Sequence, residues 1–392
     1  MKTSPLRTAI MACAVLATAA CTLPPRDLPT RPVAPSALPG WSADPLDGVA
    51  TAVARQCAVK APPAPWPALC TEFAGLPAAP GARIPETAAV RRWLESRFEA
   101  WPLRDAQGGF EGLVTGYYEP LLTGSRLRES AAQVPLYGRP PDLLTIDLAA
   151  LEPRLQGLRL RGRLNGQRVV PYHSRADIET ARPLDPHALL WVDDPVDAFF
   201  LEIQGSGRVR LRDGSVTRVG YADQNGHPYR AIGRTLIERG ALQPAEVTAP
   251  AIRQWLRANP AEAPAVMRTN PSVVFFRELP PLPAGAPGEA EAGPPGSLGV
   301  PLTAMRSLAV DRSVVPLGSL VWLDTVHPAD AAPLRRVMAA QDTGGAIVGR
   351  IRADFFWGFG PEASQAAGTM RARGRIWVLW PRDEAPLPTF GR

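Results

Sequence analysis

Two carboxylates flank a glycine-rich turn near the C-terminal end of this 392-residue sequence. Asp342 precedes a Thr-Gly-Gly turn, and Asp354 is followed at once by Phe355-Phe356-Trp357. Because an apolar environment disfavours the charged form of a carboxyl group, we expect a raised pKa for Asp354. An aspartic acid that holds its proton near neutral pH can donate it to a leaving oxygen. Asp342, beside small residues and backbone N–H groups, is expected to stay ionised more readily than Asp354.

Each aspartate also has a structural interpretation, in which its carboxylate caps local backbone N–H groups. Asp342 suits that role, whereas Phe-Phe-Trp after Asp354 is not a turn sequence. Asp342-Thr343-Gly344 also matches the aspartic-protease signature, but that mechanism needs two such loops and no second DTG or DSG is present. The four histidines have no metal-ligand spacing and no CxxC occurs, so we expect no metal site.

A second group of polar and aromatic residues suggests carbohydrate binding. Residues 196–207 predict a β-hairpin that leads into an amide-rich loop at 220–229, and Gly116–Pro120 adds two tyrosines and a glutamate. Sugar recognition needs aromatic faces for the rings and amide or carboxylate groups for the hydroxyls. The structural alternative is a sheet with an aromatic core and a polar turn.

The elements that must position these residues are mostly short strands. Short β-branched and aromatic runs between turn residues predict strands at 110–118, 134–137, 168–172, 188–193, 198–204, 215–221, 320–324, 335–340, 348–357 and 375–380. Helical spacing appears at 46–60, 86–100, 230–239, 247–258 and 361–373, and 280–296 reads as a loop. A mainly β fold with peripheral helices follows, and so many short strands favour barrels.

The N-terminus has the pattern of an export signal. Lys2 and Arg7 precede an apolar run that is too short to span a bilayer comfortably and ends at Cys21, as in a lipoprotein signal. We therefore expect a signal peptide over 1–20, lipidation of Cys21 and a Pro-rich tether over 21–45, with cleavage to a soluble periplasmic protein as the alternative. After export, Cys57 and Cys70 are either disulfide-bonded or two free thiols. The net charge of +6 comes without a dense Lys/Arg run, so no nucleic-acid partner is expected.

Together these segments resemble the A-type membrane-bound lytic murein transglycosylases. The matching motifs are Thr115–Pro120, Phe199–Gly207, Gly220–Gly226, Asn270–Phe276, Gly299–Ala304, Ser307–Asp311 and Ala340–Gly358. The resemblance covers about residues 110–380, and the C-terminal part resembles the three-aspartate domain. It implies a double-psi β-barrel domain formed by residues 46–119 and 271–392, with the three-aspartate region at about 295–380. A second, smaller β-barrel-like domain is inserted over 120–270.

The resemblance also implies an activity: cleavage of the bond between N-acetylmuramic acid and N-acetylglucosamine, with closure of a 1,6-anhydro ring. The catalytic aspartate of the family carries over to Asp354, first as acid and then as base, and Asp342 has a supporting role. No metal or organic cofactor is needed. The candidate glycan-binding residues are Tyr117, Tyr118, Glu119, Gln204, Ser206, Gly207, Asp223, Asn225, Thr303 and Trp357.

The implied partners are peptidoglycan strands, the outer membrane through a lipid anchor at its periplasmic face, and other wall enzymes. Two alternatives remain open. One is a non-catalytic peptidoglycan-binding lipoprotein, although the apolar flank of Asp354 argues against it. The other is an inverting murein hydrolase that uses Asp342 and Asp354 together.

Overall fold

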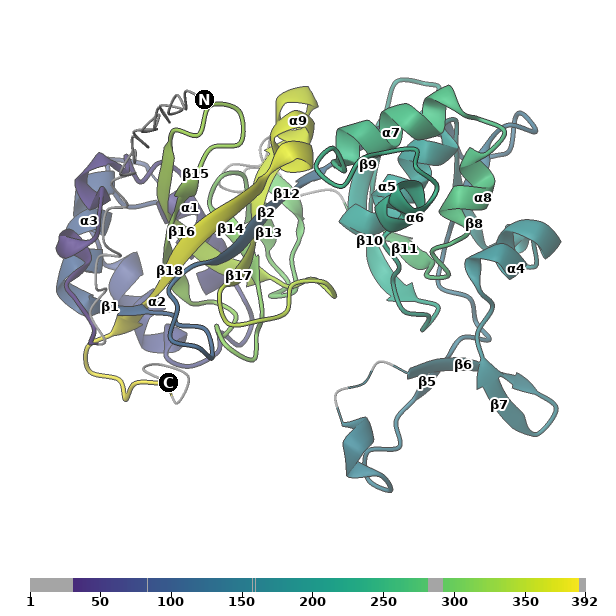
Figure 1. Ribbon diagram of the computed structural model, residues 1–392. Coiled ribbons are helices and arrows are strands. Elements are labelled where there is room, and N and C mark those ends of the chain that lie inside the picture. Colours follow the sequence, from purple (N-terminus) through teal and green to yellow (C-terminus); the bar gives the residue numbers. More distant parts are fainter. Residues whose placement is uncertain (1–30, 83, 157, 159, 281–291, 388–392) are drawn as a thin grey trace, which may run out of the picture.

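The computed structural model describes residues 31–82, 84–156, 158, 160–280 and 292–387. The predicted signal peptide and Cys21 lie outside these residues. The described chain is mainly β with helices at its periphery, as expected, and it forms two bodies that lie side by side (Figure 1). We call them the ring body, which contains both chain ends of the described part, and the insert body, which lies between them in sequence.

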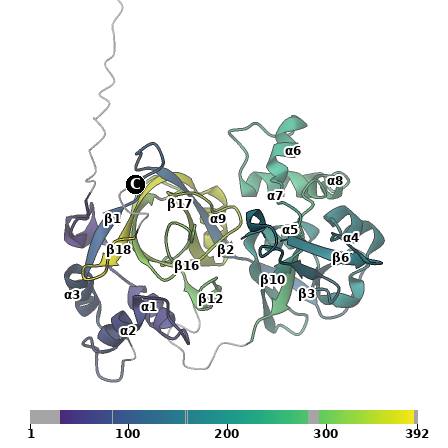
Figure 2. The same ribbon diagram turned by 90° about the horizontal axis from the view of Figure 1, so that it is seen from below.

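The ring body is built on a seven-stranded sheet in the order β1-β18-β15-β16-β14-β17-β2, and β18 also pairs with β2. This extra pairing closes the sheet on itself, as the end-on view of Figure 2 shows. The strands are β1 (Phe98–Pro102), β2 (Gly112–Glu119), β14 (Ser307–Val310), β15 (Leu320–Val326), β16 (Pro333–Asp342), β17 (Arg352–Phe359) and β18 (Arg371–Pro381). Residues from before and after the insert thus share one sheet.

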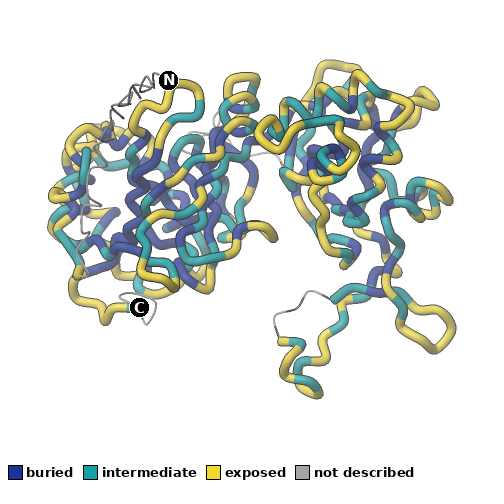
Figure 3. Tube along the Cα trace, viewed as in Figure 1, coloured by how far each residue is buried: buried dark blue, intermediate teal, exposed yellow. Residues whose placement is uncertain are grey.

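Alternation along the ring strands separates two apolar cores. On β15, Val321 and Leu323 belong to the inner core, whereas Leu320 and Trp322 face the helices outside, as the twofold period of a strand requires. The buried segments of Figure 3 follow these strands. The covering helices are α1 (Val49–Cys57), α2 (Trp66–Ala74) and α3 (Thr87–Arg97), and α9 (Pro361–Thr369) contacts β2 and β17.

The insert body contains a six-stranded sheet in the order β11-β10-β9-β3-β8-β4. Its strands are β3 (Leu121–Ser125), β4 (Val134–Tyr137), β8 (Ala188–Val192), β9 (Ser206–Arg210), β10 (Val216–Gln224) and β11 (Val274–Glu278). Its helices are α4 (Arg175–Ala181), α5 (Pro195–Gln204), α6 (Ile232–Glu238), α7 (Ala249–Ala258) and α8 (Ala263–Met267). Because β11 belongs to this sheet, the insert continues past the predicted boundary at residue 270.

Two small sheets complete the fold. A three-stranded arm of β5 (Leu144–Ile146), β6 (Leu160–Asn165) and β7 (Arg168–Pro171) projects from the insert body (Figure 1). The pair β12 (Ala292–Pro295) and β13 (Pro301–Thr303) lies where the chain returns to the ring body. Short 3-10 turns occur at Pro35–Ala37, Trp41–Ala43, Pro153–Leu155 and Asp185–His187.

The predicted tether is too long at its C-terminal end. Val33 bridges to Ala100 of β1, and Trp41 is buried against the ring helices. The buried Asp44 forms an ion pair with Arg306 at 2.7 Å, so this segment belongs to the folded ring body. Cys57 at the end of α1 and Cys70 in α2 form a disulfide.

The strand expected at 198–204 is wrong, and so is the hairpin expected at 196–207, because Pro195–Gln204 forms helix α5. Asp194 accepts hydrogen bonds from the N–H groups of Val196 and Asp197, and Gly205 ends the helix in the left-handed region at φ 78°. The side chains of α5 pack into two apolar cores, so the helix is apolar on more than one face. A short helix of that kind has the same continuous apolar run as a buried strand.

Two helix predictions also need correction. The helix at residues 66–74 was not expected from the sequence, although Pro67 stands within its first turn. The helix expected to continue to residue 373 ends at Thr369, and β18 begins at Arg371. Arg371 already pairs with Thr115 of β2, so the closing strand of the ring takes over residues that the pattern gave to the helix.

Candidate active site

Asp354 lies on β17, between two strands that are distant from it in sequence. It is paired with Ala309 of β14 on one side and with Thr115 of β2 on the other. Phe355 and Trp357 belong to the inner core of the ring, so Asp354 and Phe356 are directed to the opposite face of the strand. Asp354 is therefore one of the polar groups on the outer face of the closed sheet.

The carboxyl group of Asp354 is held by one strong hydrogen bond. Thr115 Oγ1 donates to Asp354 Oδ1 at 2.6 Å, and within the described residues no donor binds Oδ2. Burial raises the pKa of Asp354 to about 6, and the negative charge of Asp342 adds to the rise. The hydrogen bond from Thr115 and the positive charge of Arg352 act in the opposite direction. The expected raised pKa is thus confirmed, with Oδ2 left for proton exchange.

Asp342, the last residue of β16, lies close to Asp354. Both aspartates are paired with Ala309 of β14, from opposite sides. Since neighbouring strands lie about 4.8 Å apart, their Cα atoms are separated by roughly 10 Å. The register of three strands therefore brings the two carboxylates together.

The surroundings of Asp342 also disfavour its ionised form. Burial raises the pKa of Asp342, although the N–H groups of Thr343 and Ser297 and two hydroxyls partly stabilise its charge. Oδ1 accepts from Ser297 N and Oγ at 2.9 Å, and Oδ2 accepts from the Tyr117 hydroxyl at 3.0 Å. The sequence shows the small neighbours of Asp342. It does not show that Ser297, where the chain returns to the ring body, binds and covers its carboxylate.

Tyr117 lies near both aspartates and binds one of them. It is two residues from Thr115 on the same face of β2, its ring lies 5.1 Å from that of Phe356, and its hydroxyl binds Asp342. Burial and the two nearby carboxylates raise the pKa of Tyr117 well above its ordinary value, so it remains a donor. Of the predicted binding residues, Tyr117 is the one whose side chain reaches the aspartate pair.

Asp311 is a functional candidate that residue-level reasoning missed. Its carboxylate accepts from Ser313 N at 3.0 Å and from Gly349 N at 2.8 Å, which ties the loop between β16 and β17 to the end of β14. Although burial opposes it, these hydrogen bonds lower the pKa of Asp311. The motif Ser307–Asp311 was the available signal, but nothing in it indicated which loop the carboxylate would hold.

Tyr118, Glu119 and Gln204 lie at the junction of the two bodies. Gln204 Oε1 accepts from Tyr118 N at 3.1 Å, and the Tyr118 hydroxyl accepts from Arg253 at 3.1 Å. Glu119 is fully buried and forms ion pairs with Arg208 and Arg218. These contacts favour a structural role, and direct contact with glycan stays a prediction for all three.

Several other predicted binding residues are engaged within the protein. Asp223 forms ion pairs with Arg139 and Arg161, and all four hydrogen bonds of the buried Asn225 go to backbone groups. Thr303 accepts from Arg55 at 2.8 Å. Within the described residues no hydrogen bond or ion pair joins these side chains to Asp354, and their contact with glycan stays a prediction.

The remaining three predicted residues, Ser206, Gly207 and Trp357, lie in two different places. Ser206 and Gly207 begin β9 next to the junction, and a Cβ on Gly207 would lie 2.4 Å from Leu201, so that glycine is needed for packing. Trp357 is 8% exposed and packs against Phe355 and His327. Because it lies on the face of β17 opposite to Asp354, the structure places Trp357 away from the carboxylates.

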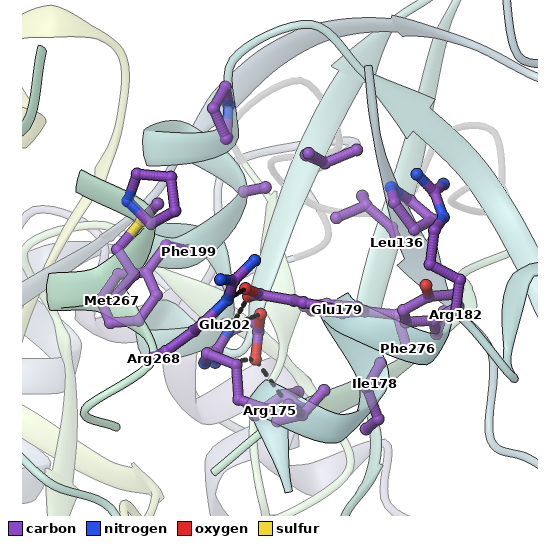
Figure 4. Close-up of a pocket in the computed structure, with 18 residues that line it drawn as sticks. Leu136, Arg175, Ile178, Glu179, Arg182, Phe199, Glu202, Met267, Arg268 and Phe276 are labelled. Atoms are coloured by element: carbon purple, nitrogen blue, oxygen red, sulfur yellow. Dashed lines mark hydrogen bonds and ion pairs between the residues drawn. The ribbon is translucent and has the colours of Figure 1, made fainter. Parts of the chain in front are cut away.

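A cavity of about 300 Å³ in the insert body is separate from these groups. The ion pair between Arg175 and Glu202 forms part of its lining, and Phe199 and Met267 form part of its apolar wall (Figure 4). None of the predicted site residues lines it. Within the described part of the chain there is no cluster of three or more metal-ligating side chains, and no helix there is long and apolar enough to cross a membrane.

Comparison with known proteins agrees with this arrangement. A family model described as the MltA specific insert domain matches residues 113–277, and a 3D domain model matches residues 306–380. The membrane-bound lytic murein transglycosylase A of Escherichia coli K12 is 32% identical over 308 residues, which cover 74% of each chain. A solved structure of E. coli MltA with bound chitohexaose is 30% identical, with a TM-score of 0.60 over 77% of this chain and 80% of that one.

Two further solved structures cover more of the chain. LtgG, a lytic transglycosylase of Burkholderia pseudomallei, is 41% identical with a TM-score of 0.60, over 90% of this chain and 95% of that one. MltA from Neisseria gonorrhoeae is 34% identical with a TM-score of 0.76, over 91% and 93%. The fold is therefore that of the MltA lytic transglycosylases. The chain belongs to the membrane-bound lytic murein transglycosylase A family.

Proposed function

We propose that this chain is a lytic transglycosylase that cleaves the bond between N-acetylmuramic acid and N-acetylglucosamine in peptidoglycan. The observation that carries the proposal is Asp354, a carboxyl group with a pKa of about 6 on the outer face of the ring. General acids work best when their pKa lies near the working pH. The membership of the chain in the transglycosylase family supports the same activity.

In this proposal one carboxyl group performs both proton transfers. Asp354, protonated on Oδ2, donates to the glycosidic oxygen while positive charge develops at the anomeric carbon of the muramoyl residue. The resulting Asp354 carboxylate takes the proton from the C6 hydroxyl of that residue, whose oxygen closes the 1,6-anhydro ring. No water is consumed, and Asp354 returns to its protonated form.

Asp342 supports this cycle without exchanging a proton. Its charge helps to raise the pKa of Asp354, and in its ionised form it would stabilise the positive anomeric centre. The hydroxyl of Tyr117 fixes the orientation of Asp342. Asp311 holds the loop that connects the two catalytic strands.

The finer structural and cellular assignments belong to the same proposal. We infer a double-psi β-barrel from the closure of β18 onto β2 and from the two parallel strand pairs. The glycan would lie between the ring and insert bodies, near Tyr117, Gln204 and Ser206. Anchoring to the outer membrane through lipidated Cys21 is supported by the sequence pattern of the first residues.

An inverting murein hydrolase is the second candidate, because two half-buried carboxylates lie near each other. The products distinguish the two reactions. A transglycosylase releases anhydromuropeptides from purified sacculi, whereas a hydrolase releases fragments with reducing ends. Mass analysis of the digest decides between them.

The catalytic roles are tested with isosteric variants in the same assay. We expect Asp354→Asn to lower the rate of anhydromuropeptide release by about 10²–10⁴-fold, because an amide cannot donate and then accept the proton. Asp342→Asn should have a smaller effect. Asp330→Asn, at an exposed position of the same region, is the control and should keep full activity. If Asp342→Asn abolishes release while Asp354→Asn leaves it intact, the two roles are reversed.

A further inference from the structure

Two arginines of the insert body lie side by side at its junction with the ring body. Arg208 of β9 and Arg218 of β10 are directly paired in the antiparallel register, and both guanidinium groups bind the carboxylate of Glu119. Arg208 Nε donates to Oε2 at 2.9 Å, and Arg218 Nε donates to Oε1 at 3.3 Å. Each oxygen of the Glu119 carboxylate therefore accepts a hydrogen bond from a different arginine.

Among the described residues, the charges of this cluster do not balance. Like charges directly opposite in a sheet destabilise it, and one glutamate offsets one of the two positive charges. The other hydrogen bonds that both guanidinium groups donate within the described residues go to the backbone oxygen of Ala292. Within the described residues, neither Nη1 group has an acceptor, and the two side chains keep 19% and 12% exposure. The cluster therefore presents a positive charge with unused donors.

The cluster is joined to the catalytic strand. The Arg208 guanidinium lies over the ring of Phe359, 4.1 Å from its centroid, and Phe359 is the last residue of β17, which carries Asp354. Phe359 is 46% exposed, which is unusual for a large aromatic side chain. Five residues of strand span at most about 16 Å, so the cluster is within reach of a polymer bound at Asp354.

The position of β9 and β10 on the insert body also suits contact of the cluster with the proposed substrate. β9 and β10 lie on the side of the insert body that faces the ring (Figure 1). Ser206 is two residues before Arg208 on the same face of β9. An exposed aromatic ring, a hydroxyl and an unbalanced guanidinium pair suit a sugar that carries a carboxylate.

We propose that Arg208 and Arg218, together with the exposed ring of Phe359, form a binding site for the carboxylate of a muramoyl residue. This inference rests on the proposed function, because it assumes a peptidoglycan substrate. The carboxylate has two sources in that polymer: the lactyl group of muramic acid in naked strands, and the stem peptide in peptide-bearing strands. Both would be bound by charge-assisted hydrogen bonds from the unused donors.

Binding is measured in the full-length Asp354→Asn protein, so that it does not depend on turnover. Three substrates are compared: peptide-bearing strands, strands stripped of peptide by an amidase, and stripped strands whose lactyl carboxylates have been converted to methylamides. Arg208→Met is introduced because it removes the charge and leaves Glu119 paired with Arg218 alone. Arg234→Met, which removes an equally charged but 82% exposed side chain on α6, is the control.

We expect Arg208→Met to raise the Kd for carboxylate-bearing strands about tenfold, as for a hydrogen bond to a charged group at a partly exposed site, and to leave the Kd for amidated strands unchanged. Arg208→Lys should recover part of the loss. A loss confined to stripped strands identifies the lactyl carboxylate, and a loss confined to peptide-bearing strands identifies the stem; either supports the site. An equal loss on all three substrates, or no loss on any, overturns it.

The failure of this inference can be told apart from failure of the proposed function. Product analysis with Asp354 intact reports the reaction, whereas the Kd ratio between carboxylate and amidated strands reports the site. A protein that releases anhydromuropeptides but binds all strands alike would disprove the carboxylate site alone. A protein that distinguishes the strands but releases no anhydromuropeptides would disprove the proposed reaction alone.

Discussion

The pKa of Asp354 lies near the neutral pH range, where a carboxyl group can both donate a proton and accept it again. At its pKa of about 6 half of the molecules hold the proton, and at pH 7 roughly a tenth do. Because cleavage in the proposed reaction begins from the protonated form, kcat/KM should fall as the pH rises above about 6. The pH dependence of catalysis thus becomes a direct measure of the surroundings of one side chain.

Thr115 should control that pH dependence. Its hydroxyl binds the charged form of Asp354 and lowers the pKa, so Thr115→Val is expected to raise the pKa by about 1 unit. The alkaline limb of kcat/KM should move to higher pH by the same amount, while the size of the side chain is nearly kept. A rate profile that drops in height without moving along the pH axis would contradict this role.

Asp354 should also reduce the stability of the folded protein. Its folded pKa of about 6 lies above the ordinary value of 3.8, so the folded state favours the proton and loses stability as the pH rises from 3.8 to 6. After a discount for partial exposure, Asp354→Asn should raise the free energy of unfolding by about 1 kcal/mol at pH 7.5. At pH 4 the variant and wild type should unfold at nearly the same temperature. Equal stabilisation at both pH values would show that the gain does not come from the charge.

The raised pKa of Asp354 was predictable, but the groups around its carboxyl were not. The flanking aromatic run gave the correct direction of the pKa shift, yet Phe355 and Trp357 point into the ring core and away from the carboxyl group. The groups that act on Asp354 are Thr115, Asp342 and Arg352. Thr115 reaches it through the pairing of strands from opposite ends of the chain, and local sequence carries no information on that register.

At the scale of elements, the start of the folded chain is held to the ring by a buried ion pair. Arg306, between β13 and β14, donates to both carboxylate oxygens of Asp44 and to the backbone oxygen of Val337 on β16. Asp44 also accepts from Val337 N at 2.8 Å. This single cluster joins the N-terminal segment to the strand that ends at Asp342.

Removal of one partner should be costly. Arg306→Met leaves the Asp44 carboxylate buried without its cation, and the free energy of unfolding should fall by about 3–5 kcal/mol. Although burial opposes it, Arg306 lowers the pKa of Asp44, so this stabilisation is present above pH 3.8 and is lost as the pH falls below that value. Arg234→Met, which breaks an exposed pair, should change stability by less than about 1 kcal/mol in the same thermal scans. Similar losses in both variants would contradict the account.

Strand positions were predicted well where a short apolar run is bounded by turn residues, as in residues 188–193 and 320–324. The pattern failed at α5, because a helix that is buried on more than one face has no polar stripe. Asp194-Pro195 and Gly205 were the signals that could have corrected it. The segment 31–45 failed for a different reason: its prolines suggested a tether, whereas the buried Trp41 attaches it to the ring helices.

At the scale of the whole molecule, two chain crossings connect the ring and insert bodies. The first follows Glu119 at the end of β2, and the second leads into β12, so the insert is attached at two points. The division into two β-rich parts was an expectation that came from the family resemblance. The side-chain contacts across the junction, such as Arg253 with Tyr118, depend on tertiary packing and were not.

The proposed lipid anchor makes a prediction about location. Cys21→Ala should release the protein from the membrane fraction, because it removes the thiol that would carry the lipid. Fractionation of cells that produce the wild type and the variant measures this, and anhydromuropeptide release in vitro should be equal for the two. If wild type and variant are both found in the soluble fraction, the anchor is wrong.

Strand β18, which closes the ring sheet, determines when that sheet can be completed during synthesis. β1 is paired with β18, and β2 is paired with β17 and β18, so the first two strands to be synthesised find their partners in the last two. Such non-local pairing folds slowly, because a long loop must close before any contact stabilises it. Until residues 371–381 arrive, β1 and β2 present unpaired edges of the kind that cause aggregation. A chain that loses only its last twenty or so residues, which include β18, would therefore lose the ring as a whole. It would also lose the pairing that brings Thr115 to Asp354.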